Sequence, residues 1–196
     1  MSSLVCGVGV NDSNYVVYKW EELGNVGGKR KKRLIWRCVF YQTWVNMIYR
    51  CYSGKESTYA GCEVCPEWLV FSSFKVWMEK QDYLGKHLDK DLLLKGNRVY
   101  CPEFCVFIAI QINSFLVDRK SKRGEFPIGV CFFKALGKYK SNCSKGNGKP
   151  QHLGYYETAE EAHEAWRKYK HLLACKLADS QSDDRVSKAL RNFYKQ

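Results

Sequence analysis

Proline and histidine are scarce in this chain, with four of each among 196 residues, and long apolar runs are missing. Without a stretch of about 20 apolar residues, the sequence contains no candidate for a membrane-spanning helix. The amino-terminal residues also lack the basic start and the apolar core of a secretory signal peptide. We therefore expect a cytoplasmic protein with no membrane partner. Its ten cysteines should remain reduced and mostly buried.

Acidic residues are few relative to basic ones, with 20 Asp and Glu against 32 Lys and Arg and a formal net charge of +12. Such a balance favours a polyanionic partner, of which nucleic acid is the common one. The alternative is a basic surface that serves only solubility. Apolar residues make up 45% of the chain and aromatic residues 15%, which is enough for packed cores and argues against global disorder.

The first 37 residues are Gly-rich and predicted to be irregular, apart from a strand-like run at 15–20. Five consecutive basic residues follow Gly27 and Gly28 and predict a basic loop: Lys29, Arg30, Lys31, Lys32 and Arg33. A loop of this kind would contact DNA phosphates without regard to sequence. The alternative is a solvated charge run.

Apolar residues recur at helical spacing from Phe40, and a second helical run follows Pro66. A short strand is predicted at 86–90 and a third helix from Pro102. In that helix Asn113 would lie about three turns from the start, on the same face as core residues. The alternative is an Asn at the end of a helix.

The basic, Gly-broken stretch 117–126 is the predicted linker. Three β-prone runs follow, at 128–133, 138–143 and 152–156, with glycine-containing turns between them. A capping-box sequence at 158–161 then opens a helix that would pack on the sheet. The last segment, 179–196, is amphipathic and should dock either on the body of the protein or on another copy.

Residues 86–113 carry a strand that ends in Asp89, a turn at Gly96-Asn97, a second short strand and an asparagine, Asn113, on a helix. With the helices before it, this stretch resembles HNH homing endonucleases, especially the phage-encoded ones, and defines a module at 38–116. The resemblance implies that Asp89 and Asn113 hold one Mg²⁺ or Mn²⁺ ion against the scissile phosphate. Such an ion stabilises charge on the phosphate oxygens.

The module departs from the family at the residue after the aspartate, where Lys90 stands in place of the general-base histidine. Lys90 would then bind phosphate or replace the base. His87 is a second candidate base. Residues two apart on a strand share a face, so His87 and Asp89 could point into one site. Asp91 is a third candidate base. In a separate departure, Phe104 stands where the family often has an asparagine. If nothing replaces the base, the module is inactive, and the protein binds DNA or acts as a phage regulatory factor that also contacts a host or phage protein.

The segment 127–178 resembles a different family, the APETALA-type (ethylene-response-factor) DNA-binding domain, at Ile128-Gly129-Val130, at Gly137-Lys138-Tyr139 and from His152 to Ala162. The resemblance implies a three-stranded sheet, braced by one helix, that enters the major groove of double-stranded DNA. The candidate DNA contacts are Lys134, Lys138, Tyr139, Lys140, Lys145, Lys149 and His152.

Four cysteines, Cys62, Cys65, Cys101 and Cys105, could together bind a structural zinc ion, although free buried thiols explain them as well. A zinc-stabilised adaptor that binds RNA is therefore a third hypothesis. The leading one is an α+β protein with a ββα-metal (HNH-like) module, a three-stranded antiparallel sheet with a helix, and a C-terminal helix. It would nick or cut duplex DNA in an infected host cell. The DNA target, the general base and the oligomeric state stay open.

Overall fold

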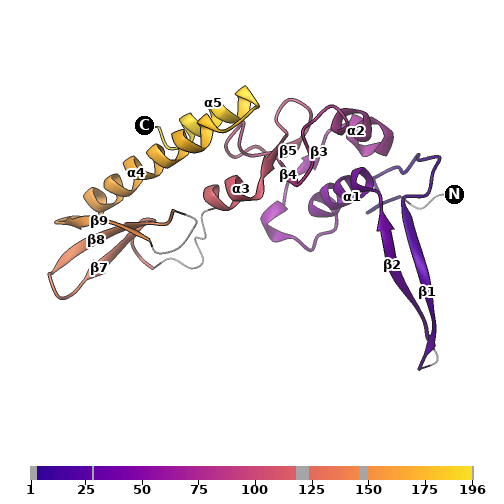
Figure 1. The fold of residues 1–196 in the computed structure, drawn as a ribbon, viewed down its shortest axis with the longest axis horizontal. Helices are drawn as coiled ribbons and strands as arrows, with labels where there is room; N and C mark the ends of the chain where they lie inside the picture. The colour runs from indigo at the N-terminus through magenta and orange to yellow at the C-terminus, as the bar shows by residue number, and fades with distance from the viewer. Residues whose placement is uncertain (1–3, 28, 118–123, 146–149, 196) are drawn as a thin grey trace. The chain divides into compact units, whose positions relative to one another are not determined.

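The computed structural model describes residues 4–27, 29–117, 124–145 and 150–195, and it divides into two compact units, Met1–Phe107 and Ile108–Gln196 (Figure 1). Both units mix helices with small sheets, which confirms the α+β prediction. Within the described ranges, no helix combines the length and the apolar character needed to cross a membrane. Most of the predicted linker, 118–123, lies outside the described residues.

The first unit contains an antiparallel ribbon in which β1 (Tyr18–Val26) pairs with β2 (Lys29–Arg37). The predicted basic loop is therefore wrong, because the basic run belongs to a strand. Two acidic residues of β1 lie directly opposite it. Glu21 pairs with Arg33 at 2.5 Å, and Glu22 pairs with Lys32 at 3.1 Å. Opposite charges across a ladder stabilise the pairing, and the sequence pattern does not reveal such partners.

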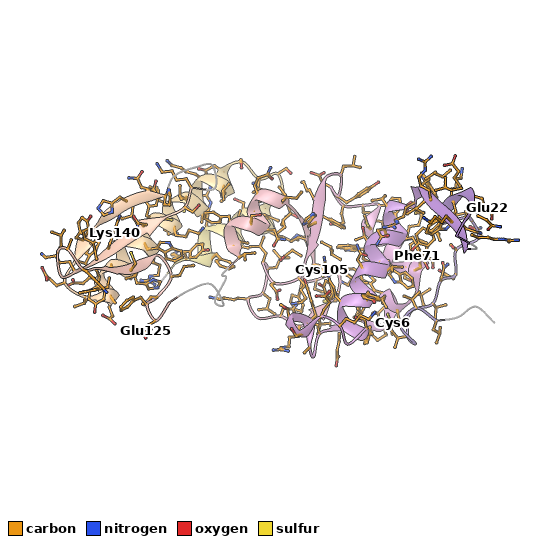
Figure 2. The ribbon with its side chains drawn as sticks, turned by 90° about the horizontal axis from the view of Figure 1, so that it is seen from below. Cys6, Glu22, Phe71, Cys105, Glu125 and Lys140 are labelled. Carbon is orange, nitrogen blue, oxygen red and sulfur yellow. The ribbon has the colours of Figure 1, made fainter. Side chains whose placement is uncertain are left out.

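The core of the first unit is aromatic and confirms the predicted helical spacing. It is built by α1 (Val39–Tyr52), the short helices η1 (Ser57–Tyr59) and η2 (Pro66–Leu69), and α2 (Phe71–Met78). Trp44, Trp68 and Phe74 are fully buried, as is Phe71, which is labelled in Figure 2. The Trp44 indole N–H donates to the Trp68 carbonyl at 2.7 Å, so burial of this ring leaves its one donor satisfied.

Short strands follow: β3 (Glu63–Val64) runs parallel to β5 (Val99–Tyr100), and β4 (Lys86–Asp89) pairs with β6 (Val106–Ala109), within which the first unit ends at Phe107. The predicted helix from Pro102 is wrong, because residues 106–109 form a strand and α3 spans only Ile110–Leu116. The periodicity of a short run of Val, Phe and Ile fits either a helix or a strand, and its β-branched and aromatic residues favour the strand. Asn113 is thus the fourth residue of α3, not three turns into a helix.

The second unit holds the predicted three-stranded antiparallel sheet, in the order β7 (Val130–Phe133), β8 (Lys138–Cys143) and β9 (Gln151–Tyr156). The long helix α4 (Ala159–Asp179) packs on one face of the sheet, and α5 (Asp184–Phe193) packs on α4. The predicted capping box is present, because Thr158 Oγ1 accepts from Glu161 N while Glu161 Oε2 accepts from Thr158 N. The C-terminal segment therefore docks on the body of the same chain.

Two contacts fix α4 in the second unit. Gly129, with φ +84°, lies so close to Trp166 that a Cβ built there would be 2.0 Å from the indole ring. At the other contact, Lys170 is buried with its Nζ 3.4 Å from the centroid of the Phe115 ring in α3. Burial lowers the pKa of Lys170, and the neighbouring Cys143 thiol partly offsets this. The helix that carries Asn113 is thereby attached to α4.

Candidate functional site

The turn after β4 is organised by the Asp89 carboxyl group. Asp89 Oδ1 accepts hydrogen bonds from Asp91 N at 2.9 Å and from Leu92 N at 2.7 Å. No described residue donates a hydrogen bond to Oδ2. Burial raises the pKa of Asp89, and the two backbone N–H groups oppose that effect. One oxygen of this carboxyl group therefore shapes the turn, and the other has no hydrogen-bond donor among the described residues.

Lys90 is only 6% exposed, unlike most lysines. Its Nζ donates to Asp91 Oδ1 at 2.7 Å and to the Asn97 carbonyl at 2.8 Å. The rings of Tyr59 and Tyr100 lie 6.0 and 5.9 Å from the ammonium group. These contacts join the two ends of the turn. An ammonium that already has two acceptors is poorly placed to reach a phosphate, so the geometry favours a positioning role for Lys90.

Asn97 closes the same turn and is 8% exposed. Its Nδ2 donates to the Lys90 carbonyl at 2.9 Å and to the Val99 carbonyl at 2.7 Å, and its Oδ1 accepts from Val99 N at 3.1 Å. The preceding Gly96 has φ +80°, a conformation that glycine adopts without strain. The Gly-Asn pair therefore has a structural reason to occur here.

The other predicted catalytic residues fall in different parts of the chain. His87 is exposed on β4, Leu88 is buried, and Asp89 is half-buried, so strand alternation does place His87 and Asp89 on one face. Asn113 is half-buried in α3. Asp89 belongs to the first unit and Asn113 to the second. Their convergence on one cation stays a prediction.

The four cysteines predicted as zinc ligands are all buried. Cys62 interacts electrostatically with Cys51, whereas Cys65, Cys101 and Cys105 interact with one another. Burial raises the pKa of Cys65 to about 11, which favours the protonated thiol over the metal-binding thiolate. Across the part of the chain that the structure describes, no three His, Cys, Asp or Glu side chains form a group that could hold a metal. Zinc binding by these four thiols stays a prediction.

The sheet of the second unit has one face covered by α4 and one that faces away from it. On β8, Ser141 and Cys143 are almost fully buried on the covered side. Strand alternation and the cross-strand register define the opposite side. We call it the outer face, and it carries Cys131, Phe133, Lys138, Lys140, Asn142, His152 and Tyr155.

Basic and aromatic side chains are interleaved on the outer face. The Tyr155 ring lies 5.4 Å from Phe133 and 4.8 Å from His152, between ring centroids. Lys140, labelled in Figure 2, places its Nζ 5.8 Å from the Phe133 centroid. Lys138 pairs with Glu157 at 2.6 Å. The result is an aromatic platform with ammonium groups around it.

This geometry brings together some of the predicted DNA contacts. Lys138, Lys140 and His152 share the outer face, whereas Tyr139 points to the covered side. There its ring packs on Phe126 and Phe132, with centroids 5.3 and 5.2 Å away, so Tyr139 does not share the outer face, and its direct contact with DNA stays a prediction. The reason is strand alternation, which places Tyr139 opposite to its two lysine neighbours.

Two further predicted contacts lie next to the ends of strands. Lys134 is exposed in the turn after β7, Lys145 is exposed just beyond β8, and Lys149 lies outside the described residues. Sequence reasoning missed Phe133, Asn142 and Tyr155. Period-two alternation with Lys138 and Lys140 identifies Asn142, but the two aromatic rings require the cross-strand register.

The ribbon β1–β2 carries the other predicted basic contacts. Lys29 begins β2, and Arg30 and Lys31 follow it with exposed side chains, while Lys32 and Arg33 form the ion pairs with β1 described above. Trp20 and Trp36 are 54% and 44% exposed. The Nζ of Lys19 lies 5.8 Å from the Trp36 ring centroid. The ribbon is thus a second surface that combines cations with aromatic rings.

Comparisons of this chain with models of protein families, with curated proteins and with solved structures give no match.

Proposed function

We propose that this protein binds double-stranded DNA through the outer face of the sheet β7–β9. The observation that carries the proposal is the composition of that face, where Lys138, Lys140 and His152 surround the Phe133 and Tyr155 rings. The three strands contain no acidic residue. Glu157, just after β9, pairs with Lys138, and the positive charge of Lys140 beside this pair attracts phosphates, while neighbouring polar and apolar groups contact base edges.

Each residue type on this face has a counterpart in the major groove. An amide such as that of Asn142 pairs with adenine, a lysine such as Lys140 with guanine, and an aromatic ring contacts the thymine methyl group. The helix α4 on the covered side holds the sheet rigid, so the contacts are preorganised. Arg30 and Lys31 on the ribbon would add phosphate contacts that do not depend on sequence.

The test is a binding measurement with the full chain and a pool of random duplex DNA, in competition with single-stranded DNA and with duplex RNA. We expect duplex DNA to bind at least about tenfold more tightly, because the deep, narrow major groove of RNA excludes side chains. The logarithm of the affinity should fall with the logarithm of the salt concentration, by about 0.9 per phosphate contact. Preferential binding of RNA would contradict the proposal and support the RNA-binding adaptor.

A second candidate function is metal-dependent DNA nicking of the HNH type. It is favoured by the pairing of β4 with β6, which α3 follows directly in the chain. It is also favoured by Asp89 at the end of β4 and by the Asp89 Oδ2 atom, which has no donor among the described residues. A carboxylate and an amide oxygen suit Mg²⁺, and Asp89 and Asn113 would hold it. The ion would stabilise charge on the scissile phosphate.

Nicking of supercoiled plasmid DNA with Mg²⁺ or Mn²⁺ tests this candidate. We expect Asp89→Ala to lower the nicking rate by more than about 100-fold. The reason is that mutating a residue that only orients a metal ligand already lowers metal affinity or activity by about 10–100-fold. Asp82→Ala is the matched control, since Asp82 is an exposed carboxylate of the same unit that pairs with Lys86. His87→Ala tests the candidate base.

Because burial raises the pKa of Asp89, this carboxyl group should take up a proton at a higher pH than an ordinary aspartate does. As the pH falls, nicking should therefore begin to decline while an ordinary aspartate is still ionised. The reason is that a protonated carboxyl group does not bind the cation. If the native chain and Asp89→Ala bind DNA equally and neither nicks it, the protein is the alternative, a DNA-binding or phage regulatory protein without nuclease activity.

A further inference from the structure

The ribbon β1–β2 exposes both of its faces. At its base, the Tyr18 ring packs edge to face on Tyr41 of α1, with centroids 5.3 Å apart. Every side chain that the structure describes in residues 19–37 is exposed, except that of Leu34, which is half-buried. A two-stranded ribbon with no second layer is only marginally stable by itself, so a bound partner would stabilise it. Its most exposed apolar side chains are Trp20, Leu23, Ile35 and Trp36.

The charge of the ribbon indicates what kind of partner fits it. Residues 18–37 contain seven Lys or Arg and two acidic residues. The two acidic side chains, Glu21 and Glu22, already form ion pairs with Arg33 and Lys32. The remaining cations have no opposite charge of their own on these two strands. A polyanion therefore complements this surface, whereas a neutral protein surface does not.

Each exposed indole ring of the ribbon has a cation close by. The register places Lys19 opposite Trp36 on one face, with Lys19 Nζ 5.8 Å from the centroid of the indole. On the other face the Trp20 ring lies 6.3 Å from the Tyr18 ring, and the Arg37 guanidinium lies 5.7 Å from the Tyr18 centroid. An indole stacks on the flat face of an unpaired base, and a cation beside it contacts a phosphate. In a duplex the bases stack on each other, so this combination selects an unpaired strand.

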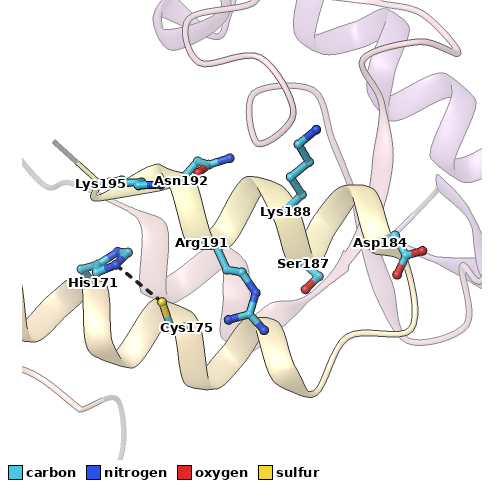
Figure 3. A pocket seen from close by; sticks show the side chains of 8 residues that line it. All are labelled: His171, Cys175, Asp184, Ser187, Lys188, Arg191, Asn192 and Lys195. Carbon is cyan, nitrogen blue, oxygen red and sulfur yellow. Dashed lines mark hydrogen bonds between the residues drawn. The ribbon is translucent and has the colours of Figure 1, made fainter.

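The second unit has a basic surface that lacks this combination. A groove of about 630 Å³ lies between α4 and α5, and Lys188 and Arg191 line it from α5, with Lys195 just beyond that helix (Figure 3). Its described lining includes no Phe, Tyr or Trp side chain. Arg191 also forms an ion pair with Asp179. This groove can attract phosphates but provides no large ring for stacking, which makes it a control surface.

We propose that the ribbon β1–β2 is a binding site for single-stranded DNA, in addition to the duplex site on the outer face. Trp20 and Trp36 each stack on one base, and Lys19, Arg30 and Lys31 contact the phosphates. Stacking and charge recognise DNA and RNA alike, and the choice of DNA rests on the proposed function. The full chain still binds duplex DNA more tightly, because the outer face contacts base edges that are ordered only in a duplex.

The experiment titrates the full chain with oligothymidylate of about 20 nucleotides, which is long enough to span such a site. Binding should quench part of the tryptophan fluorescence, because Trp20 and Trp36 are exposed. Trp20→Ala and Trp36→Ala should each lower the affinity by about tenfold, as expected for the loss of stacking on one base. Tyr49→Ala is the matched control, since Tyr49 is an exposed ring of α1 with Lys55 Nζ 5.6 Å from its centroid. It should bind like the native chain.

A second pair of variants tests the charges and leaves both indoles in place. Arg30→Gln combined with Lys31→Gln should lower the slope of log affinity against log salt by about 0.7 per lost phosphate contact, and quenching at saturation should remain. Lys188→Gln combined with Lys195→Gln removes the same charge from the groove between α4 and α5 and should keep the native slope. The folding of every variant is checked by its thermal transition in circular dichroism.

The ribbon site and the outer face can fail separately. Lys134→Gln combined with Lys140→Gln should weaken duplex binding but not oligothymidylate binding, and the two tryptophan variants should do the reverse. The ribbon proposal is overturned if folded Trp20→Ala and Trp36→Ala proteins bind oligothymidylate with the native affinity. It is also overturned if oligouridylate binds more tightly than oligothymidylate, or if vesicles of anionic phospholipid change the tryptophan emission and oligothymidylate does not.

Discussion

Replacing Lys134 and Lys140 with glutamine should lower the affinity for duplex DNA by about 10- to 100-fold at physiological salt. The two side chains lie at the turn after β7 and in the middle of the outer face, and their removal eliminates two positive charges from the proposed DNA-binding surface. The slope of log affinity against log salt should decrease by about two, one for each lost phosphate contact. Fluorescence anisotropy titrations over a series of salt concentrations measure both quantities.

The matched control is the double variant Lys168→Gln and Lys176→Gln, which removes the same charge from exposed positions of α4. Because α4 covers the side of the sheet opposite to the outer face, this variant should keep nearly all of the affinity and the native salt slope. An equal loss in both variants would mean that net charge, rather than the outer face, governs binding. The proposed interface would then be wrong.

Gly129→Ala should destabilise the second unit by about 3 kcal/mol or more. A Cβ at this position would lie 2.0 Å from Cδ1 of Trp166, and the backbone has φ +84°. Neither the Trp166 ring nor the backbone at Gly129 can move easily to make room. Trp166 is buried, and the carbonyl of the adjacent Ile128 lies 3.0 Å from His163 Nδ1 on α4. Urea unfolding followed by tryptophan fluorescence measures the free energy of unfolding, and DNA binding should be lost together with the fold.

Gly137→Ala separates the effect of the backbone conformation from the effect of packing. Gly137 has φ +64° in the turn before β8, and no atom lies within 4 Å of a Cβ built there. Its replacement by alanine should therefore lower the free energy of unfolding only by the cost of holding alanine in the left-handed conformation, about 1–2 kcal/mol. Equal destabilisation by the two substitutions would show that the contact between Gly129 and Trp166 does not hold α4 on the sheet.

Local signals in the sequence predict several elements of this protein well. The aromatic spacing from Phe40 predicts α1, the runs at 138–143 and 152–156 predict β8 and most of β9, and Thr158 with Glu161 predicts the start of α4. These features depend on residues within a few positions of each other, and short-range sterics and hydrogen bonds are enough to establish them. The sequence also identifies Gly96-Asn97 as a turn on the same grounds.

Contacts between distant residues decide the rest. The basic run at 29–33 is a strand because Glu21 and Glu22 pair with it across the ribbon, and residues 106–109 are a strand because β4 lies beside them. Lys90 is a buried member of its turn because the Asn97 carbonyl, seven residues away, accepts a hydrogen bond from its ammonium group. No periodicity encodes such partners, since they are set by the packing of separate segments.

The sequence by itself therefore determined the positive charge, the class of the fold, and the turns and helix starts that depend on neighbouring residues. Only the tertiary structure decided which side chains share a surface. It separated Tyr139 from Lys138 and Lys140, and it added Phe133 and Tyr155 to the outer face. A pleated strand exposes alternate residues, but the choice of the covered side depends on where a distant helix packs, and here α4 makes that choice.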